Sequence, residues 1–137
     1  MKSIFTIIFS VIYTLSFSQR LQENDGQYFS RVEYSVSNKN NSEIYSKCRS
    51  FLDSEITDKQ ILNDNTEEKI KKFSGTAKKD KISFDFEVIC FNDRFLVRLT
   101  NFKYKNSPIE KKEKFIPEIN QYLLELFGRW QYFVRYS

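Results

Sequence analysis

The stretch FDFEVICFNDRFLVRLTNF, residues 84–102, alternates apolar and polar residues, breaks at Asn92 and Asp93, and then alternates again. This alternation is typical of strands with one buried face, and a two-residue break between two such strands indicates a hairpin. With a tight turn at the break, the pairs on one face are all apolar: Cys90 with Phe95, Val88 with Val97, and Phe86 with Leu99. A slip of one residue would destroy this agreement, so the pattern predicts an antiparallel hairpin in this register.

The same register fixes the pairs on the other face of the hairpin. They are Glu87 with Arg98, Asp85 with Thr100, and Ile89 with Leu96. Opposite charges at facing positions attract each other, so we expect a surface ion pair between Glu87 and Arg98.

Further strands are expected on both sides of this hairpin. Residues 28–36, YFSRVEYSV, alternate and predict a first strand, whereas residues 19–27 are polar and indicate a short lead-in arm. Residues 60–62 and 69–78 predict two weaker strands, with Gly75 marking a bulge. Residues 103–115, KYKNSPIEKKEKF, form a lysine-rich connector.

Two segments show helical spacing. Asn40 followed by Glu43 is typical of a helix start, and it predicts a helix over residues 41–57. Its apolar face consists of Ile44, Tyr45, Cys48, Phe51, Leu52 and Ile56. A second helix is expected from Pro117 to the C-terminus, because proline favours the first turn. Its apolar face consists of Ile119, Tyr122, Leu123, Leu126, Phe127, Trp130, Phe133 and Val134.

These elements predict one α+β domain over residues 28–137. The expected order is β-α-β-β-β-β-α, with an antiparallel sheet of about five strands. Because both helices are amphipathic and the strands alternate, the simplest packing is two layers with both helices on one face of the sheet.

The first residues, MKSIFTIIFSVIYTLSFS, predict a secretory signal peptide over residues 1–18. Lys2 precedes an apolar run over residues 4–17, and small residues stand at Ser16 and Ser18, so we expect cleavage between Ser18 and Gln19. The alternative is an uncleaved anchor, but a bilayer span needs about 20 apolar residues. The chain is therefore expected to be exported, periplasmic or envelope-associated, with no membrane span after cleavage.

The composition excludes several chemistries. The sequence has no histidine, which rules out Ser/His/Asp and Cys/His catalysis. It also lacks phosphate-binding and dinucleotide-binding glycine motifs and any CxxC pair. The formal charge of +4 is mild, and lysines alternate with acids, so a nucleic-acid partner is not expected. We therefore predict no catalytic, cofactor-binding or metal-binding residues.

Three segments resemble a bacterial family of unknown function, DUF4468, which has a TBP-like fold. They are NNSEIYSKC at residues 40–48, KIKKFSGTA at residues 69–77, and ISFDFEVICFNDRFLVRLTNFKY at residues 82–104. The resemblance covers about residues 29–105 and implies an exported α+β domain. It implies no reaction and no catalytic residues, and a TBP-like fold does not by itself imply DNA binding.

Cys48 and Cys90 are both predicted to point into the layer between helix and sheet. In an exported protein a disulfide is a reasonable expectation, and closing this loop would stabilise the fold by roughly 4 kcal/mol. However, a helix above a sheet leaves about 8 Å between the Cα atoms, where a disulfide needs less than about 7 Å. The sequence leaves two interpretations open, a disulfide or a pair of buried thiols.

The sheet face away from the helices is the candidate site. It is expected to carry Phe29, Arg31, Glu33, Asp85, Glu87, Ile89, Phe91, Leu96 and Arg98. Ile89, Phe91 and Leu96 form a candidate interaction patch, against the plainer interpretation of ordinary surface apolarity. The favoured function is a non-catalytic binding module for an unknown envelope protein or component. One alternative is an envelope hydrolase that uses the paired carboxylates Asp85 and Glu87. The other is a structural accessory protein that pairs through a sheet edge.

Overall fold

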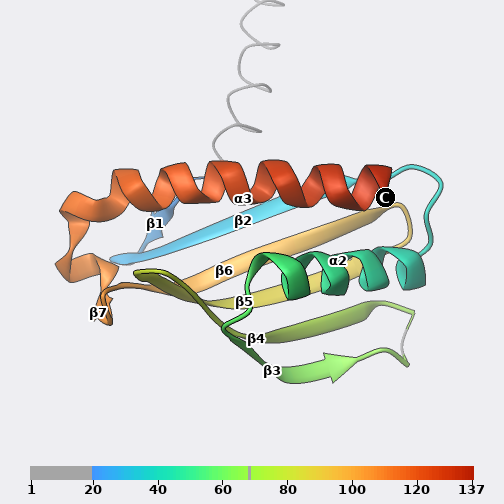
Figure 1. The fold of residues 1–137 in the computed structure, drawn as a ribbon, viewed down its shortest axis with the longest axis horizontal. Coiled ribbons are helices and arrows are strands. Elements are labelled where there is room, and N and C mark those ends of the chain that lie inside the picture. Colours follow the sequence, from blue (N-terminus) through green and yellow to red (C-terminus); the bar gives the residue numbers. More distant parts are fainter. Residues whose placement is uncertain (1–19, 68) are drawn as a thin grey trace, which may run out of the picture.

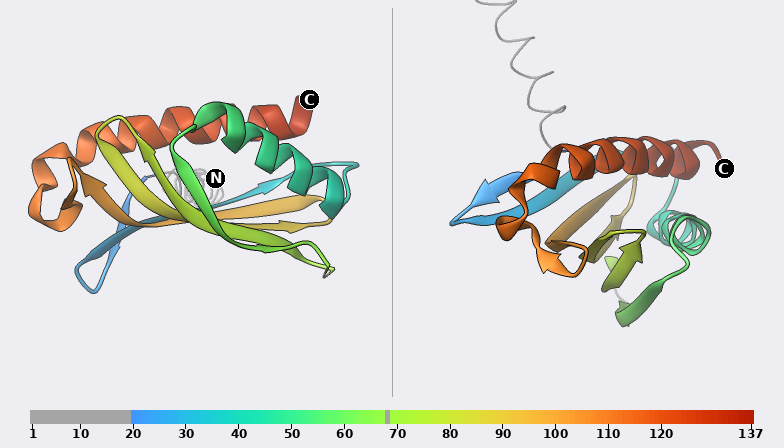
Figure 2. Two further views of the ribbon diagram at one scale, coloured as in Figure 1. Left: turned by 60° about the horizontal axis from the view of Figure 1, so that its bottom comes forward. Right: turned by 60° about the vertical axis from the view of Figure 1, so that its left-hand side comes forward.

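Two helices, α2 (Asn41–Glu55) and α3 (Ile116–Tyr136), lie side by side over one face of an antiparallel sheet (Figures 1 and 2). The structure is a computed structural model that describes residues 20–67 and 69–137. The predicted signal peptide and its cleavage site before Gln19 lie outside the described residues. The α+β class and the placement of both helices on one face are as predicted.

Within the described residues the sheet has seven strands, whereas about five were expected. They are β1 (Gln22–Asn24), β2 (Gln27–Ser35), β3 (Lys59–Asn65), β4 (Lys71–Lys79), β5 (Ile82–Phe91), β6 (Arg94–Tyr104) and β7 (Ser107–Pro108). Their order across the sheet is β1-β2-β6-β5-β4-β3, and the short β7 pairs with β6. The first strand of the prediction, β2, therefore inserts beside β6 and makes the hairpin strand β6 central.

The β5–β6 hairpin has the register that the sequence predicts. Cys90 faces Phe95, Val88 faces Val97 and Phe86 faces Leu99. One irregularity was not expected: between the Ser83–Lys103 and Asp85–Thr100 pairs, Phe84 faces two residues, Asn101 and Phe102. Asn101 has a positive φ of 54°, which asparagine tolerates better than most residues. This bulge turns Phe102 back toward the helices, where it is buried.

The lead-in arm predicted for residues 19–27 needs correction, because Gln22–Asn24 form strand β1. β1 pairs with β2 through a two-residue turn at Asp25 and Gly26, with φ of 52° and 77°. Two successive positive φ values are typical of the type I′ turn, for which Asp-Gly is a favoured sequence. The signal for this strand was therefore present in the turn rather than in the strand.

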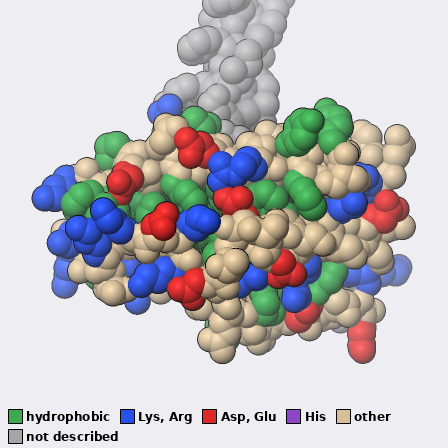
Figure 3. Space-filling model, viewed as in Figure 1, with side chains coloured by type: hydrophobic (Ala, Val, Ile, Leu, Met, Phe, Trp, Pro, Cys, Tyr) green, Lys and Arg blue, Asp and Glu red, His purple; other side chains and the backbone are tan. Residues whose placement is uncertain are grey.

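The lysine-rich connector also contains more structure than expected. Lys105 and Asn106 make another turn with two positive φ values, which brings β7 against β6. Two short 3₁₀ turns, Ile109–Lys111 and Glu113–Phe115, then lead into α3, and Ile109 of the first turn is fully buried. Lys and Arg side chains gather at this end of the molecule, on the left of Figure 3.

The bulge expected at Gly75 is present in the β3–β4 pair. Ile61 faces Gly75 and Asn63 faces Ser74, so the extra residue is Leu62 on the neighbouring strand β3. Gly75 itself is the point where the backbone of β3 comes very close. A glycine at this position therefore allows the two strands to approach.

Both helices begin where the sequence predicts. The side chain of Asn40 accepts a hydrogen bond from the backbone N–H of Glu43 over 2.9 Å, as an N-cap residue does. Helix α2 ends at Glu55, two residues earlier than expected. Pro117 lies in the first turn of α3, where its missing N–H costs nothing.

A single cluster of buried apolar side chains joins the two layers. Trp130 of α3 lies at its centre, with its ring centre 5.2 Å from that of Phe51 on α2 and 6.3 Å from that of Phe95 on β6. Six of the eight residues predicted for the apolar face of α3 are buried, namely Ile119, Leu123, Leu126, Phe127, Trp130 and Val134, whereas Tyr122 and Phe133 are only half-buried. The core and the two helices cover the inward face of the sheet, so only its opposite face is open to a ligand or partner.

Candidate functional site

The sheet face opposite the helices, which we call the open face, is where candidate site residues gather. Figure 2 shows that both helices lie on the other side of the sheet. The side chains that alternate onto the open face include Phe29, Arg31, Glu33, Asp85, Glu87, Ile89, Phe91, Arg94, Leu96 and Arg98. The structure thus brings every residue of the predicted patch and ion pair onto one surface.

The predicted patch is assembled, but charged side chains cover part of it. Ile89 and Leu96 face each other across the hairpin, and Leu96 is only 9% exposed. The guanidinium carbon of Arg94 lies 4.4 Å from the ring centre of Phe91, and Arg94 also pairs with Glu33 over 3.1 Å. A partner would therefore meet Arg94 as well as apolar surface, and the role of the patch stays a prediction.

The two carboxylates proposed as a catalytic pair make different contacts. Arg98 Nη2 lies 3.8 Å from Glu87 Oε1, so the predicted ion pair forms at the outer limit of contact. Asp85 instead accepts a hydrogen bond from the side-chain amide of Asn101 over 3.3 Å. A hollow of about 360 Å³ near β3 is lined by Glu87 and Ser74, among others, but Asp85 does not line it. The pair is therefore split between two environments.

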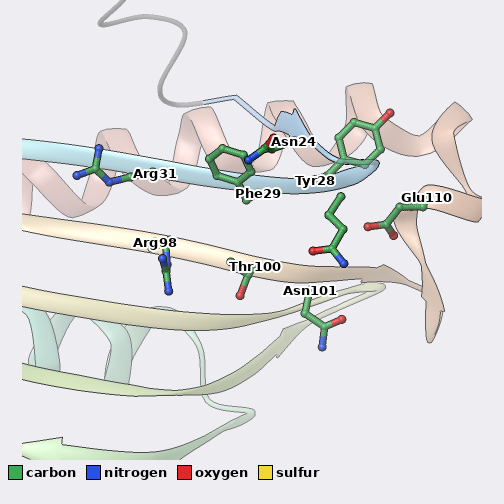
Figure 4. A pocket seen from close by; sticks show the side chains of 9 residues that line it. Asn24, Tyr28, Phe29, Arg31, Arg98, Thr100, Asn101 and Glu110 are labelled. Atoms are coloured by element: carbon green, nitrogen blue, oxygen red, sulfur yellow. The ribbon is translucent and has the colours of Figure 1, made fainter.

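A second hollow on the open face, which we call the β2–β6 hollow, has a volume of about 570 Å³. Figure 4 shows it from close by, with Arg31 and Phe29 on β2 and Arg98 and Thr100 on β6. It is lined by Asn24, Gln27, Tyr28, Phe29, Arg31, Arg98, Thr100, Asn101 and Glu110. The lining therefore combines two guanidinium groups, three side-chain amides, two hydroxyls and two aromatic rings with one carboxylate, that of Glu110.

Two arginines face each other at this hollow. Arg31 and Arg98 are direct cross-strand partners in the β2–β6 register. Arg98 has Glu87 on its other side, whereas no acceptor within the described ranges makes an ion pair or hydrogen bond with the Arg31 side chain. Like charges at facing positions repel each other, so this pair raises the local positive potential and favours an anion between them.

Sequence reasoning placed Arg31 and Arg98 on the open face but did not find the hollow. Asn24 lines it because β1 folds back along β2, and Glu110 lines it because the connector is structured. The Asp-Gly dipeptide at residues 25–26 was the available signal for the first of these. The bulge that sets Asn101 at the rim has no comparable signal in the sequence.

A third hollow, of about 730 Å³, lies between α3 and the turn that joins β4 to β5. Its lining mixes Lys79, Lys81 and Arg129 with Asp80, Glu118 and Glu125, so it has no dominant charge. The hydroxyl of Tyr122 is buried there without a hydrogen-bond partner in the described part of the chain. Burial, with a smaller contribution from Glu55, raises the pKa of Tyr122 well above its usual range.

The two cysteines lie in the core, away from all three hollows. Both are free thiols and fully buried. The indole Nε1 of Trp130 donates to Cys48 Sγ over 3.4 Å, and burial raises the pKa of the Cys48 thiol. In residues 20–67 and 69–137, no three carboxylates or thiols come together as metal ligands. Nor does any helix of these ranges have the length and apolarity to cross a membrane.

Comparison with known proteins identifies the architecture. No protein-family model matches the chain, and no curated protein does. A solved structure of a TBP-like protein from Parabacteroides distasonis covers 85% of this chain and 97% of its own, with a TM-score of 0.65 and 12% identity. A solved DUF4468 family protein from Bacteroides ovatus covers 78% of this chain and 85% of its own, with a TM-score of 0.58 and 15% identity.

At such low identities the likeness shows the fold alone. The chain has the TBP-like α+β fold, as the sequence resemblance implied, and a DUF4468 protein shares that fold. Any function must therefore be argued from the surface of this chain.

Proposed function

We propose that this protein is an exported cell-envelope domain that binds an anionic group non-covalently in the β2–β6 hollow, without catalysis. The observation that carries the proposal is the facing pair Arg31 and Arg98 at a hollow on the open face. The predicted signal peptide is the support for export.

The size and chemistry of the hollow support binding. Ligand sites in proteins usually measure about 300–1,000 Å³, and the hollow falls within that range. Guanidinium groups bind carboxylate and phosphate through paired hydrogen bonds. Phe29 and Tyr28 add apolar surface beside them, so an anion attached to a flat or apolar group would use both features.

The hydrolase alternative has less support. Carboxylates that work as an acid and a base need to face one substrate in a shared cleft. Asp85 and Glu87 have separate partners, Asn101 and Arg98, and the hollow that Glu87 lines does not include Asp85.

The sheet-edge alternative is also less favoured. The outer strand β3 is interrupted by the bulge at Leu62, and irregular edges are poor templates for an added strand. A nucleic-acid partner is disfavoured because Glu33, Asp85 and Glu87 share the open face with the arginines.

The test is a titration of the ¹⁵N-labelled chain from Gln19 onward with citrate, a compact carboxylate probe, at constant ionic strength. We expect saturable shifts of the backbone amides of residues 27–31 and 98–101. In Arg31→Gln/Arg98→Gln these shifts should be lost, because the two guanidinium groups are gone. Undiminished shifts in that variant would overturn the proposal.

A matched control removes two positive charges elsewhere on the open face. Arg94→Gln/Lys72→Gln changes the net charge by the same amount, and neither residue lines the β2–β6 hollow. We expect this variant to bind citrate as the unaltered protein does. Equal losses in the two variants would mean that citrate responds to net charge alone, which contradicts a specific site.

Export is tested separately, because binding in solution does not depend on it. Expression of the full sequence should yield a processed protein in the envelope fraction whose N-terminal residue is Gln19. Retention of Met1 in the recovered protein would contradict export by the predicted signal peptide.

A further inference from the structure

Cys48 and Cys90 come from different layers of the fold and meet in its core. Cys48 lies on the inward face of α2, and Cys90 lies on the inward face of β5, opposite Phe95. Both are fully buried and belong to the same apolar cluster. Figure 1 shows α2, which carries Cys48, running over β5, which carries Cys90.

The two thiols interact directly with each other. After burial, the neighbouring Cys90 thiol is the next cause that raises the pKa of the Cys48 thiol, so the two side chains lie close enough to interact. A general helix-over-sheet spacing predicted a separation too large for a bond. The two side chains nevertheless meet across that gap, so a bond would require α2 and β5 to approach by only about 1 Å at Cys48.

We propose that Cys48 and Cys90 form a disulfide bond that ties α2 to β5 when the protein folds under oxidising conditions. The two S–H bonds are lost and one Sγ–Sγ bond forms. The two electrons and two protons pass to a second disulfide, such as glutathione disulfide or the disulfide of a thiol oxidase, which is reduced to two thiols, the protons exchanging through solvent. The exchange passes through a mixed disulfide between one cysteine and the oxidant.

Other uses of this pair fit the surroundings less well. A metal site would need further ligands, and no third thiol or carboxylate joins the two cysteines in the described part of the chain. A redox-sensing thiol must be accessible to its oxidant, whereas both cysteines are covered by the core and Cys48 also by Trp130.

The burial of the pair determines when the bond can form. Thiolate is the attacking species in disulfide exchange, and burial raises the pKa of the Cys48 thiol, so little thiolate exists in the folded state. An oxidant also has no path to either sulfur once the core has closed. The bond must therefore form while the chain folds, and a protein folded in the reduced state should resist oxidation.

The test compares two routes to the same oxidant, using the chain from Gln19 onward, which contains the whole core. In the first, the reduced and denatured chain refolds in a glutathione and glutathione disulfide buffer. In the second, it refolds under a reducing phosphine, and glutathione disulfide is added only afterwards. Both samples are quenched in acid, unfolded, treated with N-ethylmaleimide and weighed intact.

We expect the first sample to take up no maleimide and to weigh less by two hydrogen atoms. The second sample should still take up two maleimides per chain after it has been incubated with glutathione disulfide for much longer than the refolding time. Two maleimides in the first sample, or glutathione adducts or disulfide-linked dimers in place of the internal bond, would overturn the proposal. This mass measurement needs no variant, so it stands even if substitutions in the core prevent folding.

Thermal unfolding gives an independent readout. The oxidised protein should melt at a higher temperature than the reduced protein, because the bond restricts the unfolded chain. Cys48→Ala/Cys90→Ala is the control, and its melting temperature should be the same in both buffers. A lower melting temperature for the bonded protein would show that the native geometry does not accommodate the bond.

Discussion

A Cβ atom on Gly75 would lie 2.0 Å from the backbone carbonyl oxygen of Gln60 on the neighbouring strand. Backbone atoms of β3 cannot move aside as a flexible side chain can. We therefore expect Gly75→Ala to lower the free energy of unfolding by about 1–3 kcal/mol, measured by urea denaturation. Gly128→Ala is the matched control: α3 leaves open space there, and alanine should stabilise the helix by up to about 1 kcal/mol. Equal effects of the two substitutions would contradict the close approach of β3 and β4.

The start of α2 depends on the side chain of Asn40, which accepts a hydrogen bond from the N–H of Glu43. Asn40→Ala should destabilise the protein by about 1 kcal/mol, because that N–H loses its acceptor. Asn40→Asp keeps an acceptor at the same place and should retain most of the stability. Chemical denaturation of the three proteins gives the comparison, and an alanine variant as stable as the aspartate variant would rule out the cap.

The Tyr122 hydroxyl is buried without a partner among the described residues, and its removal should be tolerated. Tyr122→Phe is expected to leave stability at neutral pH unchanged or to raise it by about 1 kcal/mol, since an unsatisfied buried hydroxyl is unfavourable. Urea denaturation at neutral pH measures this change. A clear loss of stability would indicate that the hydroxyl has a hydrogen-bond partner after all.

Alkaline pH should separate Tyr122→Phe from the unaltered protein. Burial raises the folded-state pKa of Tyr122 above the unfolded value, so the folded state holds its proton more tightly. This contribution to stability is complete below about pH 10 and falls as the pH rises further, toward the folded-state pKa. Tyr122→Phe should lose less stability than the unaltered protein between about pH 9 and pH 11. Tyr132→Phe, at a tyrosine that is 66% exposed, is the control and should follow the unaltered protein.

The β5–β6 turn places Asp93 at a φ of 64°. Its backbone also accepts from Val36 N–H and donates to the Lys39 carbonyl, over 2.7 and 3.0 Å. Glycine adopts this conformation freely and retains both bonds, so Asp93→Gly should stay within about 1 kcal/mol of the parent. Asp93→Val should destabilise by at least about 1 kcal/mol, because a β-branched residue resists positive φ. If circular-dichroism melts of the two variants coincide, the turn does not have this conformation.

The central hairpin and both helices could be predicted from the sequence because their signals are local. In residues 84–102 the alternation and the turn agree with only one register, and the structure has that register from the Asp85–Thr100 pair to the turn. In α3 the apolar spacing names each buried side chain. The pairing of β2 with β6 was beyond this reasoning, since alternation shows which face of a strand is buried but not which strand lies beside it.

The missed strands are short and polar. Gln22–Asn24 and Ser107–Pro108 have no apolar alternation, because each lies at the margin of the sheet where little is buried. Each short strand is instead marked by the tight turn beside it, at residues 25–26 and 105–106, in which both central residues have a positive φ. The β2–β6 hollow depends on both marginal segments, which is why Arg31 and Arg98 could be placed on the open face but not recognised as its lining.

The strand order has a consequence for how the chain folds while it is being synthesised. β2 is made early, yet its partner β6 is encoded much later, and α3 completes the core last. A chain that emerges with its N-terminus first, from a ribosome or from a translocation channel, cannot complete the pairing of β2 with β6 until residue 104 has emerged. Non-local pairing of this kind folds slowly, and unfinished sheets aggregate readily. The nascent chain should therefore require a holding chaperone through most of its synthesis.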